Sequence, residues 1–207
     1  MWAFYLQLFF TIFIVIDPIG IVPLFLSTVA NLETEKRRQL AYRAVVVAFV
    51  VLSVFILGGR YILSFFGISP GAFYVAGGIL FFLISMDMLF ARSKRSKTSE
   101  QESEDDTASL AVFPLAIPMI SGPGAITTIM LYSADSHSWL TITLLLFAAV
   151  IPVLALVYLA MRMSSLILKV LGKTGVSVVE RMMGLILSGL SVQFVYRGLI
   201  KLSILAS

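Results

Sequence analysis

Long apolar runs dominate the hydrophobic pattern of this chain, and most charged positions fall between them. A helix that spans a membrane needs about 20 consecutive, mostly apolar residues. Six stretches meet this requirement: Ala3–Ala30, Gln39–Gly59, Gly71–Phe90, Ser109–Tyr132, Trp139–Met161 and Arg181–Leu199. Because nothing large remains for a soluble domain, the pattern predicts an all-α membrane protein with six transmembrane helices.

The composition agrees with a lipid environment. Of the 207 residues 59% are hydrophobic and only 13% are charged, whereas soluble domains carry roughly a quarter charged residues. The mean hydropathy is +1.02. The absence of cysteine excludes disulfides, thiolate chemistry and cysteine metal sites.

The basic residues are distributed unequally between the two sides of the membrane. If the six segments alternate, 12 of the 15 Lys and Arg residues fall on the side of the 1–2, 3–4 and 5–6 links. The positive-inside rule therefore places these links in the cytoplasm and both termini on the outer, periplasmic side of the inner membrane. This distribution explains the net charge of +4, so we expect the lipid bilayer and no nucleic acid as a partner.

The chain contains a weak internal repeat. "SFFGIS" resembles "KVLGKT", which matches Gly67 with Gly172 at an offset of 105 residues, and the same offset matches Pro18 with Pro123. One inserted residue then matches Gly78 with Gly184 and Ser85 with Ser191, at an offset of 106. Since each half has three spans, the second must cross in the opposite sense, which predicts two inverted three-helix repeats.

These repeats occupy residues 1–91 and 109–207, and a charged cytoplasmic linker, residues 92–108, joins them. Small residues four apart in helices 3 and 6 (Ala72 and Ala76, Gly184 and Ser188) are expected to allow close helix packing.

Helices 1 and 4 contain helix-breaking motifs at matched positions, "VIDPIGIVP" and "FPLAIPMISGPGAITT". Proline inside a helix removes a backbone hydrogen bond, and paired breaks of this kind indicate a transporter binding site. Asp17-Pro18 has the chemistry of an N-cap followed by a first helical residue, and Gly122-Pro123 takes that part in the second half, with Ser121 nearby. The alternative is that the prolines only kink packed helices.

Two helix starts that face each other would bind the carboxylate of an amino acid, because each exposes free N–H groups and a partial positive charge. Thr127 and Thr128, with the freed carbonyls, could receive its ammonium group.

Asp17 is also a candidate for ion coupling. A charged Asp at the bilayer centre costs about 2.5–3.5 kcal/mol, and a helix start returns at most about 2 kcal/mol. The difference favours a water-filled cavity or a bound proton, although a simple capping role stays open. For Asp87 and Glu180 we expect positions at the membrane interface.

Three segments, "DPIGIVPLFLS", "PLAIPMISGPGAI" and "ERMMGLIL", resemble the MarC family, also called the neutral amino acid transporter (NAAT, SnatA-like) family. The resemblance implies a six-helix inner-membrane protein that transports glycine, alanine or serine. It places the binding motif on Asp17, Pro18, Gly20, Gly122, Pro123 and Gly124. Family members often carry Asn at the position of Asp17, which leaves the substrate and the coupling ion of the acidic variant open.

The sequence thus predicts a secondary transporter of small neutral amino acids, coupled to H⁺ or Na⁺ and without a cofactor. The chain has no G-x-x-x-x-G-K-[ST] loop for ATP. The alternative is an exporter or channel for another small solute. We do not expect an enzyme, because Asp17 and Asp87 are predicted at different depths and the sequence lacks the histidines of a serine or metal peptidase.

Overall fold

A computed structural model describes residues 2–30, 32–90, 115–134 and 138–204. Every regular element in these ranges is helical, which confirms the all-α class. In chain order the helices are α1 (Trp2–Ile16), α2 (Ile21–Thr28), α3 (Thr34–Phe65), α4 (Pro70–Leu89), η1 (Leu115–Ile120), α6 (Pro123–Ala134), α7 (Trp139–Arg162) and α8 (Ser164–Lys201).

The described helices provide five candidate membrane spans, one fewer than the sequence predicts: Trp2–Thr28, Thr34–Phe65, Pro70–Leu89, Trp139–Arg162 and Ser164–Lys201. The predicted span Ser109–Tyr132 starts outside the described residues, as does the whole predicted linker 92–108. Its described part is divided between η1, with 6 residues, and α6, with 12. At 1.5 Å per residue, neither piece alone crosses a hydrocarbon core of about 30 Å.

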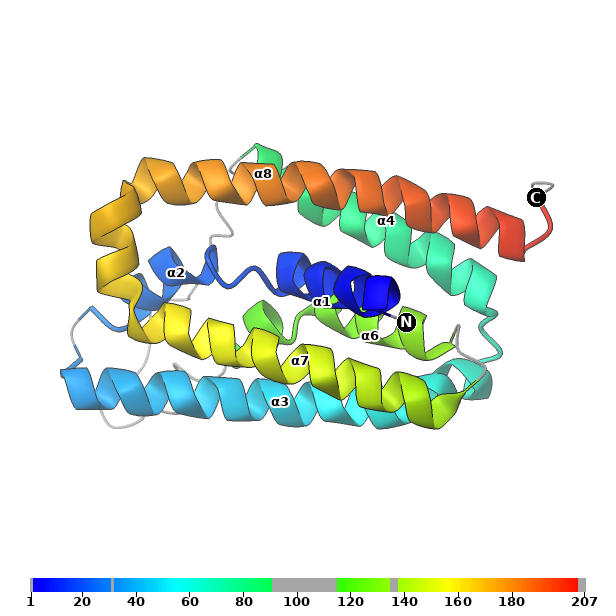
Figure 1. Ribbon diagram of the computed structural model, residues 1–207, viewed down its shortest axis with the longest axis horizontal. Helices are drawn as coiled ribbons and strands as arrows, with labels where there is room; N and C mark the ends of the chain where they lie inside the picture. Colours follow the sequence, from blue (N-terminus) through cyan, green and yellow to red (C-terminus); the bar gives the residue numbers. More distant parts are fainter. Residues whose placement is uncertain (1, 31, 91–114, 135–137, 205–207) are drawn as a thin grey trace.

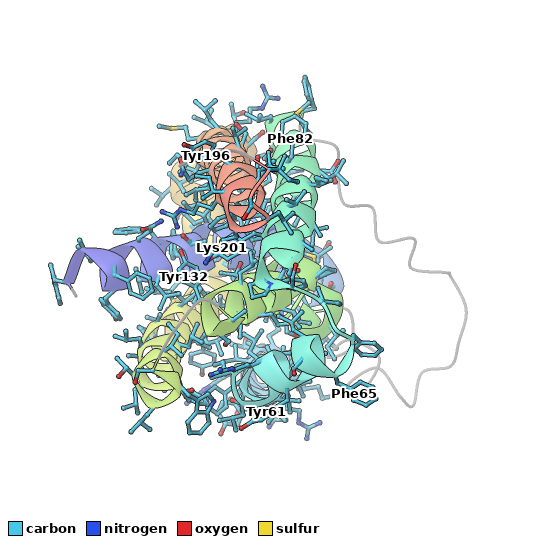
Figure 2. All side chains as sticks on the ribbon, turned by 90° about the vertical axis from the view of Figure 1, so that its right-hand side faces the viewer. Tyr61, Phe65, Phe82, Tyr132, Tyr196 and Lys201 are labelled. Carbon is cyan, nitrogen blue, oxygen red and sulfur yellow. The ribbon has the colours of Figure 1, made fainter. Side chains whose placement is uncertain are left out.

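The helices form an elongated bundle in which α3, α7 and most of α8 follow the long axis (Figure 1). Seen from the end that carries the C-terminus, α4 and α8 lie together at one edge, α3 and α7 lie at the opposite edge, and α1 and α6 run between them (Figure 2). The helices of the two predicted repeats are therefore interleaved, since α3 packs on α6 and α7, and α1 packs on α7.

Large apolar side chains cover the outside of the bundle. Tyr61, Phe65, Phe82 and Tyr196 are 67%, 83%, 44% and 48% exposed and point away from the interior, while Tyr132 points into it (Figure 2). A soluble domain rarely exposes a continuous apolar surface of this extent. This surface is the one expected to face lipid in an integral multi-pass membrane protein.

The tightest helix pair, α4 with α8, is built on small residues spaced seven apart. A Cβ added to Gly78 would lie 2.7 Å from the carbonyl oxygen of Ser191, and one added to Gly184 would lie 3.1 Å from that of Ser85. Backbones approach this closely only where side chains are missing or small. The predicted positions Ala72 and Ala76 are wrong, because both side chains are exposed on the other face of α4.

Two glycines turn the chain at matched positions in the two halves. Gly67, after α3, has φ 64°, and Gly172, inside α8, has φ 66°. Side chains with a Cβ avoid this left-handed region, so glycine is the favoured residue at both turns. The turn at Gly172 divides α8 and produces the bend at the left of Figure 1.

Candidate functional site

The first predicted break coincides with the gap between α1, which ends at Ile16, and α2, which begins at Ile21. Asp17 ends α1: its N–H donates to the carbonyl of Phe13 at 2.9 Å, and its φ is 53°. Asp and Asn are the residues other than glycine that enter this left-handed region most readily. Asp17 therefore suits this turn, whereas most other residues with a Cβ would be strained at this φ.

The carboxylate of Asp17 also organises the start of α2. Its Oδ1 accepts the N–H of Gly20 at 3.0 Å, three residues further on, as an N-cap side chain does. The regular helix nevertheless begins at Ile21, with Gly20 at the cap position, and not directly after Asp17 at Pro18. Asp17 thus ends one helix with its backbone and supports the next with its side chain.

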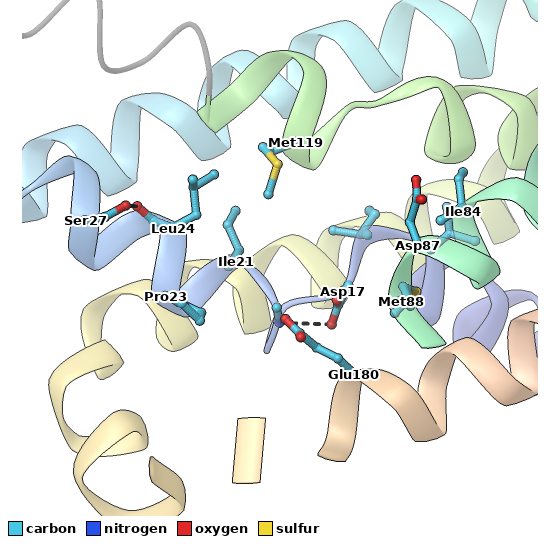
Figure 3. A pocket seen from close by; sticks show the side chains of 13 residues that line it. Asp17, Ile21, Pro23, Leu24, Ser27, Ile84, Asp87, Met88, Met119 and Glu180 are labelled. Carbon is cyan, nitrogen blue, oxygen red and sulfur yellow. Dashed lines mark hydrogen bonds between the residues drawn. The ribbon is translucent and has the colours of Figure 1, made fainter. Parts of the chain in front are cut away.

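A cavity of about 420 Å³ adjoins this gap, a volume within the range of small-molecule sites. It is bounded by α1, α2, α4, η1 and α8 (Figure 3). The lining side chains are mostly apolar, but three are acidic and none is basic: Val15, Ile16, Asp17, Gly20, Ile21, Pro23, Leu24, Ser27, Ile84, Asp87, Met88, Met119 and Glu180.

Two of the carboxylates approach the same point in the cavity. A Cβ added to Gly20 would collide with the Asp17 carboxylate and would lie 2.8 Å from Oε1 of Glu180. Figure 3 shows Glu180 reaching from α8 toward Asp17, with Asp87 on the separate wall formed by α4. The carboxylates of Asp17 and Glu180 therefore both lie beside Gly20.

Asp87 and Glu180, for which we expect positions at the membrane interface, both line the cavity and are half-buried. For Glu180 the helix boundary differs from the prediction, because α8 begins at Ser164 and breaks at Gly172, before the predicted helix start at Arg181. Glu180 therefore lies within the second segment of α8 and not at a helix start. The sequence signal for both residues was the one used for Asp17, an acid adjoining apolar sequence.

The second predicted break lies between η1 and α6 and has a different chemistry. Within η1, Ile117 leaves helical geometry (φ −133°, ψ 117°). The hydroxyl of Ser121 donates to the carbonyl of Ala116 at 2.7 Å, and the side chain is buried. Helix α6 begins at Pro123, and the first helical bond runs from Ile126 N–H to the carbonyl of Gly122 at 3.1 Å.

Helix α6 packs against the cavity wall from behind. A Cβ on Gly124 would lie 2.8 Å from Val15 and 2.9 Å from Ile84, two lining residues. The hydroxyl of Thr128 is buried and donates to the carbonyl of Gly124 at 2.8 Å. The Thr127 methyl group packs against Gly77 of α4.

Of the predicted site residues, Asp17 and Gly20 line the cavity. The others lie outside its lining: Pro18, Ser121, Gly122, Pro123, Gly124, Thr127 and Thr128. Met119 of η1 is the lining residue that lies near the second break. In the described part of the chain no group of three His, Cys, Asp or Glu side chains is placed to hold a metal ion.

A helical bundle with an apolar outer surface and a cavity between its helices is typical of an integral, multi-pass α-helical membrane protein. Comparison with known proteins gives the family. Residues 2–203 match the family described as "MarC family integral membrane protein". This chain belongs to the MarC family.

The relatives are archaeal and bacterial membrane proteins. A UPF0056 membrane protein of Pyrococcus abyssi is 38% identical over 93% of this chain and 92% of its own length. The UPF0056 membrane protein YvbG of Bacillus subtilis is 35% identical, over 96% and 95% of the two chains. A UPF0056 membrane protein of Buchnera aphidicola is 31% identical, over 96% and 92%. No solved structure matches the chain.

Proposed function

We propose that this protein is a secondary transporter of small neutral amino acids, of the size of glycine, alanine or serine, coupled to H⁺ or Na⁺ across the inner membrane. The observation that carries the proposal is the interrupted helix at Asp17–Gly20, which opens onto a cavity of about 420 Å³ lined by three carboxylates. Interrupted helices at the binding site are a recurring feature of secondary transporters.

The proposed architecture has six spans in two inverted repeats, with η1 and α6 completing the fourth span. The matched glycines Gly67 and Gly172 support it, because they share a left-handed φ of 64° and 66°. So does the α4–α8 contact. Exchanging the halves at the offset of 106 converts the Gly78–Ser191 contact into Gly184–Ser85, and both contacts occur. Such reciprocity is the property of a two-fold interface.

In the proposed orientation the cavity communicates with the cytoplasm. The segments between α2 and α3 and around the α7–α8 bend lie at the end of the bundle away from the C-terminus (Figure 1). Helices α3, α7 and α8 carry exposed basic residues in these segments: Lys36, Arg38, Arg162, Lys169 and Lys173. Basic residues gather on the cytoplasmic side. The cavity reaches the protein surface at Pro23 and Ser27 of α2, next to that end.

The lining suggests how a zwitterion and a cation share the site. The ammonium group of an amino acid pairs with carboxylates, and a small apolar side chain fits among Ile21, Ile84 and Met88. A coupling cation or proton at Asp17 and Glu180 relieves the repulsion between these two acids. Loading of the cation and of the substrate would therefore be linked.

Uptake into proteoliposomes tests the proposal. Labelled glycine, alanine and serine are offered separately under an imposed proton gradient and an imposed sodium gradient, with wild type and Asp17→Asn side by side. We expect gradient-driven uptake by wild type. In Asp17→Asn we expect exchange to continue without dependence on the gradient, because the titratable group is lost. If folded wild type moves none of the three, the substrate class is wrong.

One observation favours a second candidate, an exporter or channel for a cationic solute. None of the lining residues is basic, so the cavity offers no side chain of opposite charge to a carboxylate. A simple amine, ethylamine, is therefore included among the test solutes. Flux of ethylamine without flux of amino acids would select this candidate, and saturation of that flux would separate an exporter from a channel.

A further inference from the structure

The internal repeat relates three residues of the cavity lining to three residues elsewhere in the bundle. Exchange of the two halves at the repeat offsets assigns each of these three residues a counterpart in the other half. At the offset of 105, Ser27 of α2 corresponds to Tyr132 of α6. At the offset of 106, Met88 of α4 corresponds to Phe194 of α8, and Glu180 of α8 corresponds to Tyr74 of α4.

These three counterparts meet in one aromatic cluster. The rings of Tyr74 and Phe194 are 5.8 Å apart at 73°, and those of Tyr132 and Phe194 are 6.5 Å apart at 82°. Edge-to-face packing of this kind is favourable between aromatic rings. Tyr74, Tyr132 and Phe194 are 1%, 3% and 1% exposed. The counterparts of these three lining residues therefore form one buried cluster of rings.

Other side chains close this cluster on two sides. Thr11 of α1 is buried, and its hydroxyl lies 3.5 Å from that of Tyr132. The ammonium of Lys201, near the end of α8, lies 5.7 Å from the centre of the Tyr74 ring, within the range of a cation–π interaction. Lys201 is the last residue of α8, whose C-terminal end lies away from the bend (Figure 1). The cluster thus lies on the side of the bundle away from the bend of α8.

We propose that Tyr74, Tyr132 and Phe194 form the closed outer gate of the transport path. This inference rests on the proposed function and deepens it. In the conformation described here the path is open at Ser27, Met88 and Glu180 and closed at their three counterparts. In the opposite conformation the rings separate, and the cavity side closes. Two states related by exchange of the repeats are what an inverted repeat permits.

The absence of cysteine allows the gate to be tested by single-cysteine labelling. Thr11→Cys reports on the space behind Tyr132, and Ser27→Cys reports on the cavity. A membrane-impermeant cationic thiol reagent is applied separately to the face that carries the termini and to the opposite face, in sealed vesicles of defined orientation. We expect Ser27→Cys to react from the face opposite the termini and Thr11→Cys to react slowly from both.

Truncation of the gate should then expose the reporter. Phe194→Ala combined with Thr11→Cys should react about tenfold faster from the face of the termini, because a minor open state becomes well populated. Leu52→Ala is the matched control, since Leu52 is fully buried in α3 and is not part of the cluster. It should leave the labelling rate of Thr11→Cys unchanged. Equal acceleration by Phe194→Ala and Leu52→Ala would overturn the proposal.

A second variant tests the gate without truncating any of its residues. Ser27→Tyr with Met88→Phe installs the gate residues on the cavity side, which should close that side and drive the protein toward the opposite state. We expect faster labelling of Thr11→Cys from the face of the termini, and no change in that rate would contradict the gate. Labelling needs no substrate. If only the substrate class is wrong, wild type shows no uptake but the changes in labelling rate still occur. If the gate is wrong, the changes in labelling rate are missing.

Discussion

The two helix interruptions place the same kind of break in two different environments. At the first, Asp17 carries a left-handed backbone, bonds to Gly20 and faces a cavity. At the second, Ser121 is buried and bonds to Ala116, while Gly124 packs against the back of the cavity wall. The first interruption thus has an acidic side chain that lines a cavity, and the second has small residues packed against neighbouring helices.

The difference shows that proline and glycine determine where a helix stops but not what the stop is used for. Both breaks contain an X-Pro pair that begins or precedes a helix. The side chains beside the pair then decide the environment, because a carboxylate requires solvent or a counterion and a hydroxyl is satisfied by one carbonyl. The following variants test this division, in order of the expected loss in the free energy of unfolding.

The largest loss is expected for Gly124→Val at the packed interruption. Its Cβ would lie within 2.9 Å of both Val15 and Ile84, so α6 must shift away from the wall. Overpacking of this kind costs about 3 kcal/mol at the upper end of its range. The measurement is the equilibrium unfolding of purified protein in detergent. Gly58→Val on α3 is the matched control, because a Cβ there meets no atom within 4 Å. Equal losses in the two variants would show that the packing of Gly124 is unimportant.

A smaller loss, of about 2 kcal/mol, is expected for Asp17→Val at the open interruption. A β-branched residue is strained at φ 53°, and the bond to Gly20 is lost. Asp17→Gly separates the two causes, since glycine tolerates this φ and loses only the hydrogen bond. In the same unfolding assay Asp17→Gly should therefore be the more stable of the two. The reverse order would show that the left-handed turn is not a constraint.

For Ser121→Ala we expect a loss of about 1 kcal/mol, the value of one buried hydrogen bond. The carbonyl of Ala116 keeps its second donor, the N–H of Ser121, at 3.0 Å, so no buried acceptor is left unpaired. Ser27→Ala removes an equivalent bond, to the carbonyl of Leu24 at 2.7 Å, from an exposed side chain. The free energy of unfolding should therefore change less in Ser27→Ala than in Ser121→Ala. A larger change at Ser27 would reverse the assignment of the packed and open sides.

The sequence supports the helical class strongly, because long apolar runs leave few alternatives in lipid. The boundaries were harder to predict: α8 extends from Ser164 to Lys201 with a break at Gly172, so the helical segment that contains Glu180 starts before the predicted start at Arg181. The fourth predicted span is described only from Leu115 onward.

The candidate site was only partly predictable for a related reason. Asp17 and Gly20 follow from local chemistry, because a polar break in an apolar run is visible in the sequence. Asp87 and Glu180 reach the cavity through tertiary packing of α4 and α8, which one sequence does not specify. The contact of α4 with α8 follows a spacing of seven through Gly71, Gly78 and Ser85, and the prediction used a spacing of four.

The smallest effect on stability is expected for Asp17→Asn, within about 0.5 kcal/mol of wild type. Asn enters the left-handed region as readily as Asp, and its amide oxygen can accept the N–H of Gly20 in place of Oδ1. The substitution also removes a charge that crowds Glu180. Equilibrium unfolding of the two proteins checks the expectation, and Asp17→Gly serves as the control that lacks the acceptor. If Asn matches Asp, a change in gradient-driven uptake reports on the lost acid and not on a damaged turn. A loss as large as that of Asp17→Gly would show that the turn requires the carboxylate itself, and the coupling role would then need a different variant as its test.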